Sequence, residues 1–177
     1  MTIIAAYRGS DGIYIGSDSC GVMNQEISSD IGPKLIRHGN YIVGFTKSYR
    51  TADIIQESNK IPDRIDSIYG VREFRDVLQD ALKTEVKDKN GAENSQLWVL
   101  IATPRDIWHI CTDYMINRVL HYDAIGSGYQ VAIGSLFTSW QAKETAKKAV
   151  TLAVKSAIKH QVYCGGKAFV WEAKENK

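Results

Sequence analysis

The chain opens with MTIIAAYRGSDGIYIGSD, residues 1–18. Thr2–Tyr7 is made mostly of apolar and β-branched residues, which predicts a strand. The sequence GSDG at 9–12 predicts a turn, and Ile13–Asp18 then returns as the second strand of a hairpin. Such a hairpin brings Asp18 close to the beginning of the first strand.

The rest of the chain predicts further hairpins, with its helices gathered in blocks. Cys20–Pro33 is polar and glycine-rich, which predicts a loop with a short extended piece. The strands predicted after it are Lys34–His38, Tyr41–Phe45, Gln96–Thr103, Asp106–Thr112, Asn117–Tyr122 and Ala168–Trp171. The predicted helices are one capped by Ser48 that runs through Ile55, one carrying the apolar stripe Val71–Leu82, and one over Trp140–Gln161, with a charged loop at 87–95. This order predicts an α+β fold rather than alternating βαβ units.

Length and composition narrow the class of protein. With 177 residues, the chain suits one domain spanning 1–177. Its 44% hydrophobic and 24% charged residues exclude a disordered or low-complexity protein, and a net charge of +2 argues against nucleic acid as a partner. No apolar run approaches the roughly 20 residues of a membrane span, and the N-terminus lacks the pattern of a secretion signal. Three widely spaced cysteines form no disulfide framework, so we expect a cytoplasmic protein.

Thr2 is the first residue that suggests chemistry. A small residue after the initiator Met generally permits removal of that Met, which leaves Thr2 with a free α-amine beside its hydroxyl. Such an amine has a pKa near 7.7–8.0, so at pH 7 part of it is neutral and can accept the hydroxyl proton. One residue then supplies both nucleophile and base, although a threonine in second place usually has no such role.

Asp18 and Lys34 are the next candidates. A cation near a hydroxyl lowers the pKa of that hydroxyl, and a carboxylate paired with the cation keeps it charged and aimed. Asp18 ends the second predicted strand and Lys34 begins the third. The ordinary interpretation is that Asp18 is a turn residue and Lys34 a solvated strand end, and spacing alone favours it.

Five features in order resemble the proteasome β-subunit family, including the bacterial HslV-type peptidases. They are TIIA at Thr2–Ala5, GSDS at Gly16–Ser19, Lys34, IGSG at Ile125–Gly128 and YCGG at Tyr163–Gly166. Counted from Thr2, the Asp and Lys fall at the family's offsets without a gap. The resemblance covers nearly the whole chain and implies the N-terminal-nucleophile fold, a four-layer αββα sandwich of two antiparallel sheets. It also implies threonine endopeptidase activity in a ring-shaped assembly, with no cofactor or metal.

The resemblance also implies a role for each matching residue. Thr2 attacks the scissile carbonyl and forms an acyl-enzyme. Lys34 tunes the proton transfer, and Asp18 holds Lys34. Ser127 hydrogen-bonds near the Thr2 amine and helps to relay protons, while the backbone amide at about Lys47 stabilises the oxyanion.

The expected partners are further copies of the chain, in a six- or seven-fold or an open or helical ring, with polypeptide substrates threaded in by an AAA+ ATPase. The sequence departs from the family at three places. Thr46–Ser48 reads TKS where the family usually has a small residue and then Gly, and Gln161 and Cys164 replace an Asp and a Ser found in many β-subunits. Two alternatives therefore stay open: a catalytically inactive ring subunit or scaffold, and an N-terminal-nucleophile amidase.

Other motifs carry weaker predictions. Gly126–Gly128 could cradle a phosphate, but it lacks the rest of a P-loop or dinucleotide motif. The four histidines lack metal-ligand spacing, and the lysines within Trp140–Gln161 suit a solvated helix face. Cys20 lies close to the predicted site, where a packed residue is expected more often than a reactive thiol, and Cys111 and Cys164 are expected in the core.

Overall fold

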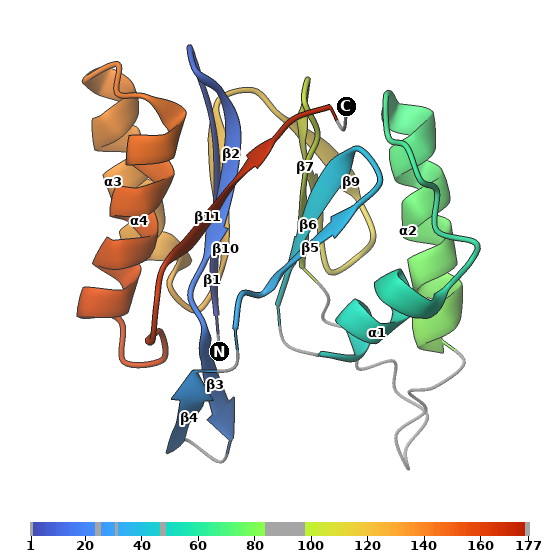
Figure 1. Ribbon diagram of the computed structural model, residues 1–177, viewed down its shortest axis with the longest axis horizontal. Helices are drawn as coiled ribbons and strands as arrows, with labels where there is room; N and C mark the ends of the chain where they lie inside the picture. Colours follow the sequence, from blue (N-terminus) through green and yellow to red (C-terminus); the bar gives the residue numbers. More distant parts are fainter. Residues whose placement is uncertain (1, 24–25, 31, 47–48, 84–97, 176–177) are drawn as a thin grey trace.

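The computed structural model describes residues 2–23, 26–30, 32–46, 49–83 and 98–175, which form two antiparallel sheets lying face to face (Figure 1). The first sheet has the order β10-β1-β2-β11, with β1 at Ile3–Gly9, β2 at Gly12–Ser17, β10 at Tyr122–Gly126 and β11 at Phe169–Ala173. The second has the order β5-β6-β7-β8-β9, with β5 at Leu35–His38, β6 at Tyr41–Phe45, β7 at Val99–Ala102, β8 at Ile107–Ile110 and β9 at Ile116–Val119. A separate hairpin pairs β3, Cys20–Met23, with β4, Glu26–Asp30.

Helices cover the outer face of each sheet (Figure 1). The first sheet carries α3, Tyr129–Gln141, and α4, Ala146–His160, and the second carries α1, Arg50–Glu57, and α2, Ile68–Lys83. One apolar core lies between the sheets and one lies beneath each helical layer. The predicted α+β fold, a four-layer αββα sandwich, is confirmed.

The apolar composition of β1 follows from its place in the middle of the sandwich. Ile3, Ala5 and Tyr7 belong to the core shared with α3 and α4. Ile4 and Ala6 belong to the core between the two sheets. Because successive side chains of a strand point to opposite faces, a strand buried on both faces reads as a continuous apolar run.

The single helix predicted over Trp140–Gln161 is wrong, because the structure has two helices there. The chain turns between α3 and α4, and Lys143 in that turn has a φ of +53°. The Asp11 carboxylate, from the turn between β1 and β2, accepts hydrogen bonds from the main-chain nitrogens of Ala146 (2.6 Å) and Lys147 (3.3 Å). A distant residue thus satisfies the first amides of α4, which local sequence patterns do not reveal.

Two further predictions differ from the structure. The strand predicted over Asn117–Tyr122 divides, because β9 ends at Val119 and β10 begins at Tyr122, so the chain crosses there from the second sheet to the first. The loop predicted over Cys20–Pro33 contains the β3–β4 hairpin. The predicted cap Ser48 and the loop at 87–95 lie outside the described residues.

Candidate functional site

Thr2 is buried at the beginning of β1, where its main chain contacts the turn that follows β10. The Thr2 main-chain nitrogen donates a hydrogen bond to Ser127 Oγ at 3.1 Å, and Ser127 Oγ donates to the Thr2 carbonyl at 3.3 Å. The Gly128 N–H also donates to that carbonyl at 3.3 Å. Ser127 therefore lies against the nitrogen that removal of Met1 would convert into an α-amine.

Gly126 makes this close approach possible. It is the β10 partner of Ile3, and its φ of +96° is in the region that favours glycine. A Cβ atom at Gly126 would overlap the Thr2 carbonyl. The glycine of the IGSG motif thus lets the Ser127 turn close over Thr2.

Asp18 and Lys34 form a buried ion pair beside Thr2. Lys34 Nζ lies 2.6 Å from Asp18 Oδ1, and the two side chains are 3% and 0% exposed. The Ile3 main-chain nitrogen donates to the same oxygen at 3.1 Å, so the carboxylate contacts the residue next to Thr2. Lys34 is therefore not the solvated strand end of the ordinary interpretation, and Asp18, although it lies in the connection between β2 and β3, is a buried, ion-paired residue.

The two sheets bring these residues together from different layers. Asp18 follows β2, and its main-chain nitrogen donates to the Ile3 carbonyl at 3.3 Å. Lys34 precedes β5 of the second sheet, and its main-chain nitrogen donates to Ser17 Oγ at 3.0 Å. The first sheet thus contributes the nucleophile candidate and the carboxylate, while the second contributes the cation. Thr2, Asp18, Lys34 and Ser127 are referred to below as the Thr2 site.

Residues of the connection between α4 and β11 also contact the Thr2 site and its neighbours. The Gly165 N–H donates to Asp18 Oδ2 at 3.2 Å, and the Lys167 N–H donates to Ser19 Oγ at 2.8 Å. Gln161 Nε2 donates to the Ser127 carbonyl at 2.9 Å. Sequence reasoning gave no role to Ser17, Ser19 or Gly165, for which the GSDS and YCGG motifs were the available signals.

The three cysteines differ in burial. Cys20 and Cys164 are buried, as expected of packed residues, whereas Cys111 is partly exposed and is not the core residue that was predicted. Burial raises the pKa of Cys20, with the Asp18 carboxylate adding to the effect. Burial likewise raises the pKa of Cys164 to about 11, and its Sγ lies 3.8 Å from Ser127 Oγ. Both thiols are therefore protonated near neutral pH, which argues against a reactive thiol at Cys20.

The other candidates show no such convergence. Lys47, the predicted oxyanion position, lies outside the described residues. The Gly128 amide is already bonded to Thr2, so it does not point toward a phosphate site. In the part of the chain that the structure describes, no three His, Cys, Asp or Glu side chains gather as metal ligands would. Across the same ranges, no helix has both the length and the apolar character needed to cross a bilayer.

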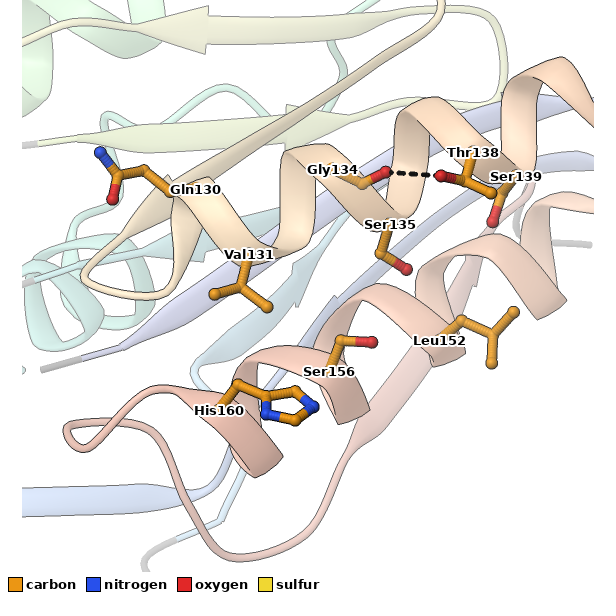
Figure 2. Close-up of a pocket in the computed structure, with 9 residues that line it drawn as sticks. All are labelled: Gln130, Val131, Gly134, Ser135, Thr138, Ser139, Leu152, Ser156 and His160. Carbon is orange, nitrogen blue, oxygen red and sulfur yellow. Dashed lines mark hydrogen bonds between the residues drawn. The ribbon is translucent and has the colours of Figure 1, made fainter.

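An open groove of about 490 Å³ runs between α3 and α4 (Figure 2). Its walls include Val131 and Ser135 from α3 and Leu152, Ser156 and His160 from α4. None of its lining residues belongs to the Thr2 site. The groove carries no group that assists chemistry at Thr2.

Comparison with known proteins agrees with the geometry. No family model matches the chain. The proteasome subunit beta of Nanoarchaeum equitans (strain Kin4-M) is 26% identical over 175 residues, which cover 93% of this chain and 89% of that protein. The structure of Thiobacillus denitrificans BPH in complex with epoxomicin has a TM-score of 0.82 and 25% identity, covering 97% of this chain and 99% of that one. HslV of Trypanosoma brucei has a TM-score of 0.77 and 18% identity, with 98% and 99% covered, and supports the fold alone.

The similarity to a proteasome subunit extends over nearly the whole chain, and the sandwich matches solved structures of BPH and HslV. The predicted resemblance is thereby confirmed: the chain is similar to proteasome β-subunits and HslV-type peptidases in sequence and fold.

Proposed function

We propose that the protein is a proteasome-like threonine endopeptidase whose nucleophile is Thr2, exposed when Met1 is removed. The observation that carries the proposal is the meeting of three groups at the beginning of β1. Ser127 Oγ lies 3.1 Å from the Thr2 nitrogen, while the Asp18–Lys34 ion pair contacts the neighbouring Ile3 amide through Asp18 Oδ1. These groups suit a threonine that transfers its hydroxyl proton to its own α-amine.

The proposed reaction uses the two functional groups of Thr2. The neutral α-amine takes the hydroxyl proton, and Oγ1 attacks the carbonyl carbon of the scissile peptide bond. The amine then gives its proton to the leaving nitrogen, so the C–N bond breaks and an ester to Thr2 remains. A water molecule, deprotonated by the same amine, attacks the ester and releases the second product.

The other members of the Thr2 site supply charge and orientation. The Lys34 ammonium provides a positive charge near the developing alkoxide, and burial strengthens its effect because no water screens it. Asp18 holds that ammonium by an ion pair and itself accepts hydrogen bonds from the Ile3 and Gly165 amides. Ser127 accepts the hydrogen bond of the Thr2 nitrogen and orients its lone pair after processing. Lys47 stays the predicted oxyanion donor.

We also propose that the protein acts within a homo-oligomeric ring. The similarity to a proteasome β-subunit supports this proposal, as do large apolar side chains on the outer helices, where Phe137, Trp140 and Leu152 are between 39% and 49% exposed. A ring would confine proteolysis to unfolded chains, so an AAA+ ATPase that unfolds and threads polypeptides is the proposed partner.

Hydrolysis of unstructured polypeptides and fluorogenic peptides tests the proposal. The wild-type chain should cleave both, and Thr2→Ala should lose at least about 10³-fold of kcat/KM because no other residue supplies the nucleophile. An amidase would hydrolyse small non-peptide amides and leave polypeptides intact.

A catalytically inactive ring subunit is the second candidate, favoured by the lysine at position 47, where the family usually has glycine. An inactive subunit would form the ring without turning over either class of substrate. Undiminished activity in purified Thr2→Ala would contradict the assignment of Thr2 as the nucleophile.

A further inference from the structure

The end of α4 reaches the Thr2 site through Gln161. Gln161 follows α4, and its main-chain nitrogen donates to the Ala157 carbonyl at 2.9 Å. The Gln161 carbonyl accepts from the Cys164 N–H at 3.1 Å. The main-chain N–H and C=O of Gln161 are therefore both hydrogen-bonded, which fixes the position of its Cα atom.

The Gln161 side chain makes one specific contact with the Thr2 site. Nε2 donates to the main-chain carbonyl of Ser127 at 2.9 Å. A backbone carbonyl can only accept, so the amide nitrogen, and not the amide oxygen, has to face it. Ser127 Oγ in turn accepts the hydrogen bond of the Thr2 main-chain nitrogen.

The Ser127 turn packs tightly on the same side. A Cβ added at Gly128 would lie 2.8 Å from Cys164 Sγ, 3.0 Å from the Ala157 Cβ and 3.1 Å from the Ile3 Cβ. The turn thus lies between β1 and the end of α4, with the Gln161 amide holding its carbonyl from the helix side. The Gln161 side chain therefore acts on Thr2 through this turn.

We propose that Gln161 is a positioning residue of the Thr2 site, whose side-chain amide fixes the Ser127 carbonyl so that Ser127 Oγ stays on the Thr2 nitrogen. This inference rests on the proposed function. It gives a function to Gln161, which stands where many β-subunits have an Asp. The essential property is a hydrogen-bond donor at the end of that side chain, since a carboxylate there would face the carbonyl with an acceptor.

Two variants test the donor. Gln161→Ala should lower kcat about ten-fold with KM within about two-fold, because the turn moves while the substrate cleft is unchanged. Gln161→Glu should be similarly slow at about pH 8, where the side chain is ionised. As the pH falls to about 4, near the ordinary pKa of a glutamic acid side chain of about 4.3, its activity relative to wild type should recover, because a protonated carboxyl again donates to the carbonyl.

The matched control is Gln56→Glu, the same substitution at an exposed position of α1. Its activity relative to wild type should stay level across the same pH range. Recovery at low pH within one variant also excludes loss of folding as the cause of slow turnover.

The outcomes separate the two proposals. A wild-type chain that hydrolyses no peptide overturns the proposed function, and the positioning role with it. An active wild type accompanied by Gln161→Ala of equal kcat, or by a Gln161→Glu ratio that ignores pH, overturns the positioning role alone.

Discussion

Lys34 Nζ lies 2.6 Å from Asp18 Oδ1, and neither side chain is more than 3% exposed. Because both side chains are buried, each charge is compensated by its partner rather than by water. The pair joins the two sheets at the point where β1 begins, since Asp18 follows β2 and Lys34 precedes β5. Its role in folding and its proposed role in catalysis can be separated by mutation.

Removing one partner should destabilise the protein. Lys34→Met leaves the Asp18 carboxylate buried without its cation, and we expect the free energy of unfolding to fall by about 3–5 kcal/mol. Unfolding in urea measures the change. A loss below about 1 kcal/mol would mean that Asp18 finds another counter-charge or water.

Removing both charges should restore stability without restoring activity. In Asp18→Asn/Lys34→Met, neither side chain carries a charge, so we expect most of the lost unfolding free energy to return. Peptide turnover should stay about 10²-fold or more below wild type, since the cation that assists Thr2 is missing. A stable double variant with full turnover would contradict the role proposed for Lys34.

Gly126→Ala should disturb the Thr2 site, whereas the same substitution at Gly12, another glycine with a positive φ, should not. Both Gly126 and Gly12 have positive φ values, +96° and +116°, which cost an alanine about 1–3 kcal/mol. Only at Gly126 would the added Cβ overlap the Thr2 carbonyl, whereas Gly12 faces open space. We therefore expect Gly126→Ala to lose turnover as well as stability.

The control, Gly12→Ala, should lose stability and keep turnover within about two-fold of wild type. Thermal melts and peptide hydrolysis on both variants give the comparison. Equal turnover in the two would show that Thr2 is not held by the turn after β10.

Alkaline pH should weaken the fold through Cys164. Burial raises the pKa of this thiol from an ordinary 9.0 to about 11, so above pH 9 the unfolded chain releases the proton while the folded chain keeps it. The unfolded state then binds fewer protons, and the free energy of unfolding falls as the pH rises from 9 to 11. Urea unfolding across this range should show a steeper decline for wild type than for Cys164→Ser. Parallel declines would contradict the raised pKa.

Strong local signals predicted much of the fold. The two hairpins that contain β1 and β2, and β5 and β6, follow from apolar runs separated by glycine-containing turns. The helix α2 follows from its apolar stripe. The unpredicted α3 contains Gly134 and several β-branched residues, and its apolar residues form no narrow stripe. Its separation from α4 depends on Asp11, far away in the sequence.

The candidate site was predictable to a similar degree. Thr2, Asp18, Lys34 and Ser127 were named from the sequence, and hydrogen bonds and an ion pair link them in the structure. The burial of the ion pair could not be inferred, because it depends on how two sheets meet. The contact of Gln161 with the Ser127 carbonyl was equally hidden, since a side chain bonded to a main chain 34 residues away leaves no pattern in either segment.

The most direct test of the central claim is the mass of the protein from its native host before and after incubation with a peptide epoxyketone. This reagent combines with an adjacent hydroxyl and free amine, which Thr2 offers only after Met1 is gone. We predict that Met1 is absent, that each active chain gains the mass of one inhibitor at Thr2, and that Thr2→Ala gains none. Retention of Met1 in every molecule, or an adduct on any other residue, would contradict the assignment of Thr2 as the nucleophile.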